Sequence, residues 1–351
     1  MIEIEERIEN SFKNNLPFTV FRKPNSEEVK AVFQKENCPF YTKNFEESGF
    51  VFAPFSNKEE VLIIPYSEAD VISLYARNHV YHSNQEIGIF ETLYSDIDKN
   101  KHIQLVEKGI DFINTSGAKK IVLSRKEKIK IEDFNLMDVL KKLLFHYPTA
   151  FVYVWFHPKT GLWLGATPET LLSITDGSFK VMALASTQEY KGVMDVAWGF
   201  KEIQEHQYVV DFISSQINSD ELDISNTYTV KAGNLLHLRA DISGELSKDS
   251  SILNLINALH PTPATCGLPK EISKNFILEN ENYDREYYTG FLGEINNNSF
   301  ADLFVNLRCM KVDTEKSEVS LFVGGGITKD SIPENEWEET VAKTNVMKKV
   351  L

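Results

Sequence analysis

The sequence has few cysteines, no long hydrophobic run and no surplus of basic residues. Three cysteines, Cys38, Cys266 and Cys309, stand far apart in 351 residues. This odd number and wide spacing fit neither a disulfide framework nor a cysteine metal motif, so we expect reduced thiols. No apolar run approaches the roughly 18 residues of a membrane-spanning helix, and the first residues lack the apolar core of a secretion signal. These absences predict a cytoplasmic protein without membrane contact.

The charge balance is acidic. The chain has 37 Lys and Arg against 51 Asp and Glu, which gives a formal net charge of -14. Nucleic-acid binding requires a concentrated basic surface, so we expect no nucleic-acid partner. An anionic small molecule would have to be held by a local pocket of cationic side chains.

Strand-like segments dominate the chain, and no repeat or Gly/Ser/Pro-rich linker divides it. Long strand-rich stretches interrupted by few helices favour large antiparallel sheets packed together with helices outside, and hence the α+β class and a single domain over residues 1–351. The expected strands include residues 119–131, two runs within 150–170, and residues 288–295, 301–312 and 318–324. Helices are expected over 135–148, over 197–217 and from Pro333 onward.

Two of the expected helices carry paired carboxylates. Glu336, Glu339 and Lys343 lie at positions i, i+3 and i+7, which share one helix face. In the segment KEIQEH, Glu202 and Glu205 are again three residues apart. Each pair alone is typical of a solvated helix face.

A second interpretation applies if the two pairs converge. Like charges about 4 Å apart repel by about 4 kcal/mol at an effective dielectric of about 20, so four such carboxylates would require a cation. Ligation by carboxylate oxygens and water suits Mg²⁺. The spacing alone leaves both interpretations open.

Three charged residues interrupt apolar, strand-like sequence, where an unpaired charge is costly. They are Lys120, Glu169 and Arg308. Each also has a structural interpretation, as an exposed strand end, a helix start after Pro168 and a buried ion pair, respectively. The run FVGGGIT places three glycines after a strand and allows close approach of a ligand to the backbone, but it lacks the spacing of a phosphate-binding loop.

Nine segments together resemble the motifs of one family, the chorismate-utilising enzymes. In chain order they are KIVLSR, GATPETLL, KEIQEH, LLHL, HPTPATCGLPK, YDREYYTG, VNLRCMKV, FVGGGIT and ENEWEETVAK. The resemblance covers about residues 117–347, whereas residues 1–100 resemble the family only loosely. The family includes isochorismate, salicylate, anthranilate and aminodeoxychorismate synthases. It implies one α+β domain of antiparallel sheets with flanking helices and a Mg²⁺-dependent site.

The resemblance also implies roles for individual residues. Glu205 and Glu339 are the implied metal ligands, with Glu202 and Glu336 beside them or acting through water. The implied catalytic pair is Lys120, as the base that activates water, and Glu169, as the acid. The implied substrate-binding set is Ser186, Thr187, His237, Ala264, Thr265, Tyr288, Arg308, Gly324 and Lys343.

Within the family, HPTPATCG resembles isochorismate synthases more than the anthranilate and aminodeoxychorismate enzymes. Ala264 stands where members that release pyruvate commonly carry threonine. Lys120 is typical of members that add water. We therefore predict an isomerase that converts chorismate to isochorismate for menaquinone or siderophore biosynthesis, as a monomer. The alternatives are a salicylate synthase, component I of an anthranilate or aminodeoxychorismate synthase, and a catalytically silent chorismate-binding subunit. The sequence LASTQEY departs from the family's LAGTR loop, with Ser186 in place of glycine and Gln188 in place of arginine.

Overall fold

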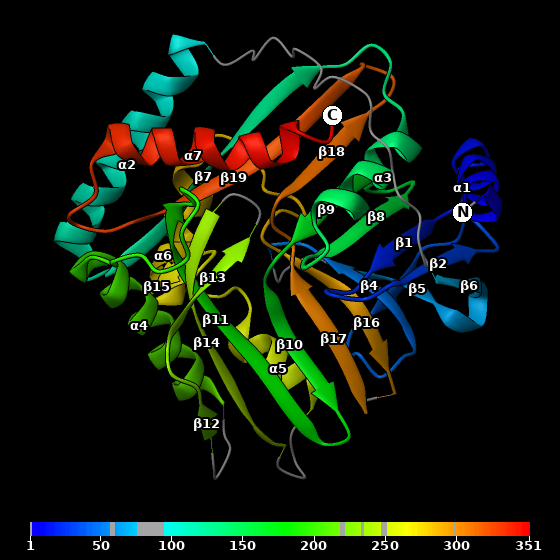
Figure 1. The fold of residues 1–351 in the computed structure, drawn as a ribbon, viewed down its shortest axis with the longest axis horizontal. Coiled ribbons are helices and arrows are strands. Elements are labelled where there is room, and N and C mark those ends of the chain that lie inside the picture. The colour runs from blue at the N-terminus through cyan, green and yellow to red at the C-terminus, as the bar shows by residue number, and fades with distance from the viewer. Residues whose placement is uncertain are drawn as a thin grey trace.

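The computed structural model describes residues 2–56, 60–75, 95–217, 222–232, 235–246, 251–297 and 299–351. Two antiparallel sheets dominate this part of the chain, and helices lie on their outer faces (Figure 1). The helices are α1 (Ile2–Lys13), α2 (Asp96–Ser116), α3 (Leu136–His146), α4 (Phe200–Gln216), α5 (Ile252–Leu259), α6 (Lys270–Asn280) and α7 (Pro333–Lys348), with a short 3-10 helix at Tyr66–Glu68.

The first sheet has the strand order β15-β7-β19-β18-β9-β8-β1-β2-β6. Its strands are β15 (Gly267–Leu268), β7 (Lys120–Lys130), β19 (Glu318–Ile327), β18 (Cys309–Asp313), β9 (Gly161–Thr167), β8 (Phe151–His157), β1 (Phe18–Arg22), β2 (Glu28–Gln34) and β6 (Ala69–Tyr75).

The second sheet has the order β12-β14-β11-β10-β17-β16-β4-β5-β3, and β13 also pairs with β14. Its strands are β12 (Leu222–Ile224), β14 (Leu235–Glu245), β11 (Ser178–Glu189), β10 (Thr170–Thr175), β17 (Phe300–Val305), β16 (Phe291–Asn296), β4 (Gly49–Ala53), β5 (Val61–Pro65), β3 (Phe40–Thr42) and β13 (Tyr228–Ala232).

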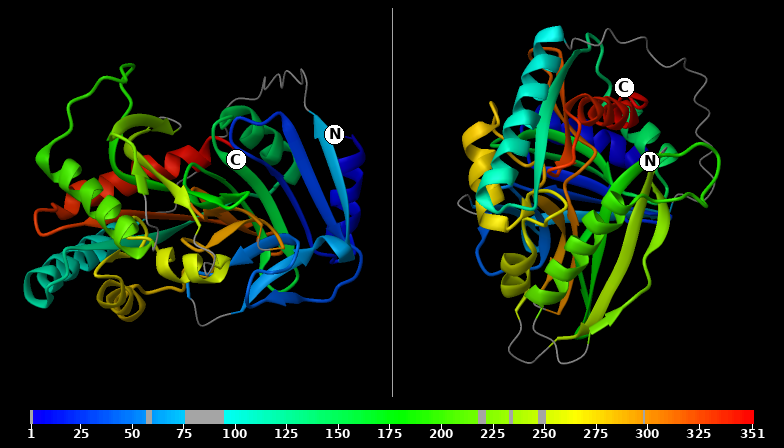
Figure 2. Two further views of the ribbon diagram at one scale, coloured as in Figure 1. Left: turned by 90° about the horizontal axis from the view of Figure 1, so that it is seen from below. Right: turned by 90° about the vertical axis from the view of Figure 1, so that its left-hand side faces the viewer.

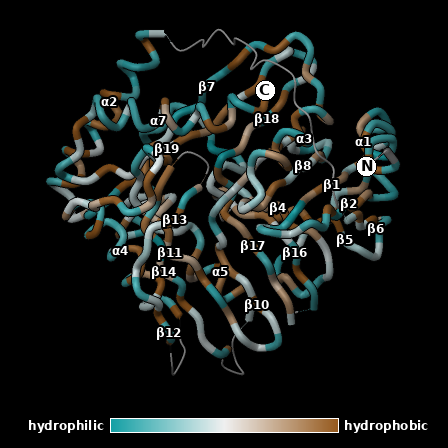
Figure 3. Tube along the Cα trace, viewed as in Figure 1, coloured by the Kyte–Doolittle hydropathy of each residue, from teal (hydrophilic) through white to brown (hydrophobic). Residues whose placement is uncertain are grey.

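Both faces of these sheets are buried, which explains why several strands are continuous apolar runs. In β8, Tyr153 and Trp155 face a core between the two sheets that also contains Phe52 of β4. Val152 and Val154 face the opposite way, into a core shared with residues of α1 and α3. A third core joins the second sheet to α4 and α5. Figure 2 shows this layered arrangement from two sides, and Figure 3 shows hydrophobic residues along the central strands with hydrophilic ones along α1.

The first 75 residues contribute strands to both sheets. Strand β1 pairs with β8 in the first sheet, whereas β4 pairs with β16 in the second. The N-terminal part and the family-like part therefore share their hydrogen-bonded ladders and the core between the sheets.

Helix α7 crosses above β7 and β19, and it packs on β19 and α2 (Figure 1). Pro333 begins this helix, as predicted, at a position where its missing N–H costs nothing. Trp337 is the apolar anchor of the helix: it is 2% exposed, and the Arg125 guanidinium lies 4.4 Å from the centre of its ring. Trp337 therefore packs α7 against β7 and α2.

The predicted α+β class is confirmed, and the prediction was wrong in local detail. Residues 301–312 form two strands separated by a break at 306–308, because the chain there passes from one sheet to the other. Tyr288 lies in a turn before β16, and the glycines of FVGGGIT lie inside β19 instead of after a strand. Helices α2 and α6 were not predicted. Within the described ranges, the structure contains no helix that is both long and apolar enough to span a membrane.

Phe52→Ala tests whether the N-terminal strands and the catalytic part unfold as one unit. The Phe52 ring is fully buried and stacks on Tyr287 with ring centres 4.3 Å apart. Removing it should lower the free energy of unfolding by about 3–5 kcal/mol in a single transition measured by urea denaturation. Phe145→Ala, at a 48% exposed position, is the control and should change little. Two separate transitions would contradict a single domain.

Candidate active site

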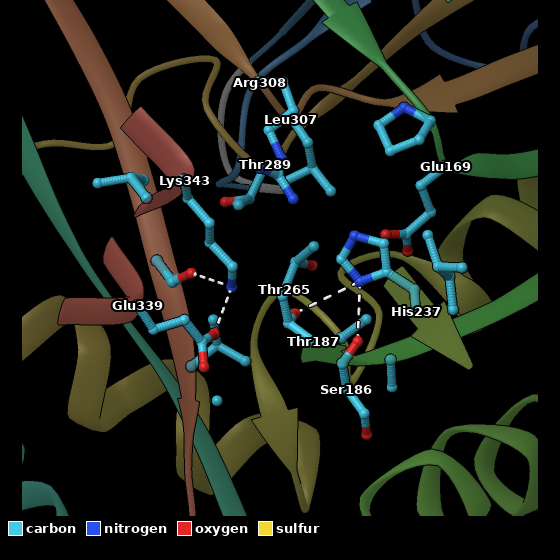
Figure 4. Close-up of a pocket in the computed structure, with 18 of the residues that line it drawn as sticks. Glu169, Ser186, Thr187, His237, Thr265, Thr289, Leu307, Arg308, Glu339 and Lys343 are labelled. Carbon is cyan, nitrogen blue, oxygen red and sulfur yellow. Dashed lines mark hydrogen bonds and ion pairs between the residues drawn. The ribbon is translucent and has the colours of Figure 1, made fainter. Parts of the chain in front are cut away.

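A cavity lies where the two sheets, α4 and α7 meet. Figure 4 shows Lys343 and Glu339 of α7 on one side of it and Glu169 and His237 on the other. Of the fifteen residues predicted for the site, only Glu336 is not in the wall. The others present are Lys120, Glu169, Ser186, Thr187, Glu202, Glu205, His237, Ala264, Thr265, Tyr288, Arg308, Gly324, Glu339 and Lys343.

The carboxylates of α4 and α7 face the same two glycines of β19. A Cβ atom added to Gly326 would lie 2.7 Å from Glu205 Oε1. One added to Gly325 would lie 3.4 Å from Glu336 Oε2 and 3.7 Å from Glu339 Oε1. The two helices therefore do converge on adjacent residues of β19. Only at Gly326 would a Cβ atom crowd a carboxylate, because the distances at Gly325 are ordinary van der Waals contacts.

Each of three carboxylates is paired with a different lysine. Lys120 Nζ lies 2.7 Å from Glu205 Oε1, and Lys343 Nζ lies 2.6 Å from Glu339 Oε1. The third pair joins Lys201 to Glu336 at 3.3 Å. Within the described residues, no three His, Cys, Asp or Glu side chains are close enough together to hold a metal ion as they stand.

The fourth carboxylate, that of Glu202, folds back toward the start of its own helix. A Cβ atom added to Gly199 would lie 2.4 Å from Glu202 Oε2. Glu334 and Glu338 are exposed, as expected from their positions on α7. Of the stripe predicted from the i, i+3, i+7 spacing, Glu339 and Lys343 line the cavity, and Glu336 lies beside it near Gly325.

The pKa values of the α7 carboxylates respond to these neighbours. Burial raises the pKa of Glu336, and the nearby Glu339 charge raises it further, against the opposing effect of Lys201. For Glu339, burial also disfavours the charge, but Lys343, Lys201 and Arg308 outweigh it and lower the pKa. Cationic side chains therefore keep Glu339 ionised.

Glu169 has the opposite character. It is 4% exposed and lies between β9 and β10, where burial raises its pKa to about 8, although Lys120 and Arg308 act to lower it. At neutral pH this carboxyl group is mainly protonated and can donate a proton. The structural interpretation as a helix start is wrong, because a strand follows it.

Arg308 lies at the break between β17 and β18, with a φ angle of 48°. This left-handed conformation is unfavourable for an arginine and is concentrated at functional sites in proteins. Its Nη1 is buried and has no hydrogen-bond partner among the described residues. A buried, unpartnered guanidinium nitrogen at a cavity wall is suited to an anionic ligand.

His237 of β14 is held as a neutral ring. Its Nδ1 donates a hydrogen bond to the Ser186 carbonyl at 2.8 Å, so Nε2 is the free acceptor. Burial, together with the Arg308 charge, lowers the pKa of His237 to about 3. The ring can therefore accept a hydrogen bond from a hydroxyl group at any working pH.

Ser186 stands where the family's LAGTR loop, in the resemblance described above, has glycine, and its backbone is left-handed. Its φ angle is 63°, in the left-handed region that glycine adopts without strain. The register of β11 against β14 shifts between Ala185 and Gln188, so Ser186 and Thr187 lie in a bulge. The Ser186 hydroxyl donates to the Glu202 carbonyl at 2.7 Å, which ties the bulge to α4.

The loop with Ala264 and Thr265 is fixed from behind by Arg285. This arginine donates to the Thr265 carbonyl at 2.9 Å and to the Val122 carbonyl at 2.8 Å. It also forms a buried ion pair with Glu281 at 2.6 Å. A bidentate, fully enclosed arginine of this kind holds the loop against β7.

Sequence reasoning missed several residues of the site. Lys201, Thr289 and Leu307 line the cavity, and Arg285 supports it. Lys201 is the first letter of KEIQEH and could have been found there, because a cation beside two acids on one helix is the expected compensation. Thr289 and Leu307 lie in the segments YDREYYTG and VNLRCMKV, but the sequence assigned no role to either residue.

Comparisons with known proteins agree with this architecture. Residues 67–351 match the family described as "Chorismate binding enzyme". Isochorismate synthase DhbC of Bacillus subtilis is 29% identical over 69% of this chain, and anthranilate synthase component 1 of Thermococcus kodakarensis is 25% identical over 77%. These matches span 65% and 64% of the two relatives' own lengths.

A crystal structure described as a putative 2,3-dihydroxybenzoate-specific isochorismate synthase, DhbC from Bacillus anthracis, superimposes with a TM-score of 0.81. It covers 99% of this chain and 98% of its own at 24% identity, so the likeness is one of fold. The family match extends over most of the chain and includes every residue of the cavity described above. The chain belongs to the chorismate-binding enzyme family.

Proposed function

We propose that this protein is an isochorismate synthase, an isomerase that converts chorismate to isochorismate. One observation carries the proposal: the cavity holds a buried carboxyl group with a pKa of about 8, Glu169, together with a buried lysine, Lys120. The reaction removes the hydroxyl group at C4 of the ring and adds water at C2, so it needs an acid and a base. The relatives named isochorismate synthase support this choice of reaction.

Glu169 is the proposed acid. Its raised pKa keeps it protonated at neutral pH, and it can give its proton to the hydroxyl group that leaves C4. The neutral His237 ring, with Nε2 as acceptor, can orient a substrate hydroxyl on the same side of the cavity. Glu169 and His237 would thus act at C4 of the ring, where the hydroxyl group leaves.

Lys120 is the proposed base for the incoming water. It is 1% exposed, at the start of β7. A base must be an uncharged amine, and Lys120 is ion-paired with Glu205 in the structure. The ammonium group therefore has to lose a proton and separate from that carboxylate, because only the neutral amine can accept a proton from water.

Cationic groups on two walls are proposed to hold the substrate carboxylates. Arg308 and Lys343 both line the cavity. Nη1 of Arg308 has no hydrogen-bond partner among the described residues, and Nζ of Lys343 donates to the Gly324 carbonyl at 2.9 Å. Bidentate recognition of a carboxylate is the usual function of such an arginine. Ala264, Thr265 and Tyr288 would shape the space for the ring.

The residues present fit a magnesium ion. The donors are carboxylate oxygens, which Mg²⁺ prefers, and the side-chain-free surface of Gly325 and Gly326 gives them room to move together. We propose Glu205 and Glu339 as ligands, with Glu202 and Glu336 adjacent or acting through water. A bound Mg²⁺ would neutralise a substrate carboxylate as charge shifts in the ring.

The pathway served, menaquinone or siderophore biosynthesis, stays a prediction. So do the cytoplasmic location and the monomeric state.

Product analysis decides between the reactions of the family. Incubation with chorismate and Mg²⁺ should give isochorismate, detected by chromatography, and turnover should stop on addition of EDTA. Salicylate with pyruvate would indicate a salicylate synthase, and an amino product with ammonia would indicate a component I enzyme. Saturable chorismate binding without product would indicate a silent subunit.

Two substitutions test the proposed acid and base. Lys120→Gln and Glu169→Gln should each lower kcat by about 10²- to 10⁴-fold, the usual contribution of one acid or base group. Lys119→Gln, at the exposed neighbouring position, is the control and should retain activity. Circular dichroism and thermal melting check that each variant is folded. Full isochorismate formation by either glutamine variant at the cavity would exclude that residue from the chemistry.

The activity should fall on the alkaline side. Because Glu169 must be protonated, kcat/KM should decrease about tenfold per pH unit above its pKa of about 8. Steady-state rates from pH 6 to pH 9.5 measure this decrease. A rate that is flat through pH 9 would contradict Glu169 as the acid.

The same pKa predicts a pH dependence of stability. The folded-state pKa of Glu169, about 8, is higher than its ordinary value of 4.5. The protonated carboxyl therefore favours the folded state fully below about pH 4.5, and this contribution is lost as the pH rises through 8. Compared with the wild type, Glu169→Gln should become relatively more stable between pH 5 and pH 8.5, by an amount on the order of 4 kcal/mol. Urea denaturation at the two pH values measures this difference, and an equal pH dependence in both proteins would contradict it.

A further inference from the structure

Lys201 is the one lysine among the carboxylates that the proposed chemistry does not use. It lies in the first turn of α4, one residue before Glu202. Its Nζ lies 3.3 Å from Glu336 Oε1 and 3.5 Å from Ser331 Oγ. The side chain is half-buried, with 36% of its surface exposed.

The charges around Lys201 come from both helices. Glu336 and Glu339 belong to α7, and Glu205 belongs to α4. Burial disfavours the ammonium form of Lys201, yet these three carboxylates outweigh burial and raise its pKa. The ammonium group thus stands in the field of three of the four carboxylates proposed to surround the metal.

Glu336 shows what this contact does. It is 4% exposed, and its ion pair with Lys201 is the only salt bridge it makes within the described residues. A buried carboxylate without a cation is strongly destabilised. Glu336 also lies in the field of another carboxylate, that of Glu339. Lys201 therefore neutralises a cluster that would otherwise repel itself.

We propose that Lys201 is a built-in counter-cation of the carboxylate cluster, which competes with the divalent ion and weakens its binding. This inference rests on the magnesium site of the proposed function. A divalent ion held by Glu339 and Glu205 would be repelled by the Lys201 ammonium, because the charge of Lys201 acts on both of these carboxylates. Metal binding must therefore move Lys201 away from Glu336 or proceed against its charge.

The long lysine side chain makes such a movement possible. Lys201 is anchored by one ion pair and a long contact to a hydroxyl group, and more than a third of its surface faces solvent. By contrast, Lys120 is almost fully enclosed, and Lys343 is held by both Glu339 and the Gly324 carbonyl. Of these three lysines, Lys201 is the least constrained and the easiest to displace.

The test is metal affinity in the absence of chorismate. The protein, residues 1–351, is stripped with EDTA, dialysed and titrated with Mg²⁺ by isothermal calorimetry. Free Mn²⁺ is followed by electron paramagnetic resonance in a parallel titration. Lys201→Met should bind both ions at least about tenfold more tightly than the wild type, because a repelling charge has been removed. Lys201→Arg keeps the charge and should stay close to the wild-type affinity.

A matched control comes from the far end of the molecule. Lys141 of α3 is paired with Glu5 of α1 at 2.7 Å and has 34% of its surface exposed, so Lys141→Met removes the same charge and a similar ion pair. It should leave the metal affinity unchanged, which separates a local effect from a change in net charge. Lys201→Gln is a second neutral variant, in case the methionine variant folds poorly.

Thermal melting adds a readout that does not depend on calorimetric heats. Without metal, Lys201→Met should melt at a lower temperature than the wild type, because Glu336 has lost its partner. With saturating Mg²⁺ it should show a larger upward shift than the wild type, because binding to the folded state is tighter.

The outcomes separate this inference from the proposed function. If the wild type binds Mg²⁺ and the neutral variants bind it equally or more weakly, Lys201 is not a competitor, and the magnesium site stands. If the wild type binds neither ion, both the inference and the metal assignment fail, while product analysis still decides the reaction. Tighter binding in Lys201→Met with an unchanged Lys141→Met supports the competition.

Discussion

The site depends on keeping several like-charged carboxylates of two helices close together against a backbone that has no side chains. Glu205 of α4 and Glu339 of α7 come from positions 134 residues apart and meet at Gly325 and Gly326 of β19. Repulsion between such groups is large in a partly buried place, and Glu205 and Glu339 each have a lysine partner. The lysines offset the charge, and Gly326 leaves space that a side chain would take from Glu205.

The two-sheet core gives this arrangement its rigidity. Strand β19 pairs with β7 along its whole length, so the glycines and Lys120 are fixed relative to each other by backbone hydrogen bonds. Strands β11 and β14 of the second sheet bring Ser186 and His237 from the opposite side. The chain passes between the sheets at Arg308, whose left-handed conformation lies at that crossing. A cavity between two sheets can thus combine groups that no single element could present together.

Much of the fold was predictable, because the spacing of apolar residues that marks a strand or a helix is a local property of the sequence. The run at residues 151–157 indicated a buried strand, and Pro333 marked the start of the last helix. The break at 306–308 was not predictable, because apolar residues continue through it and only the change of sheet shows where the strand ends. Helix α2 was missed as well. For the site, the family resemblance identified 14 of the 27 residues that line the cavity. Lys201 was overlooked because the resemblance assigned roles only to the two glutamates of KEIQEH.

The sequence by itself determined which residues can do chemistry here: two acid pairs at helical spacing, a glycine run, and three charged residues in apolar surroundings. It also determined the class of the fold, because the periodicity of apolar residues within each segment indicates whether that segment is a strand or a helix. Only the tertiary structure decided that the acid pairs converge, that each is neutralised by a lysine, and that Glu169 rather than another carboxyl group is buried enough to stay protonated near neutral pH. Convergence and burial arise from contacts between distant segments, and charge and desolvation act through space, so no local pattern contains them.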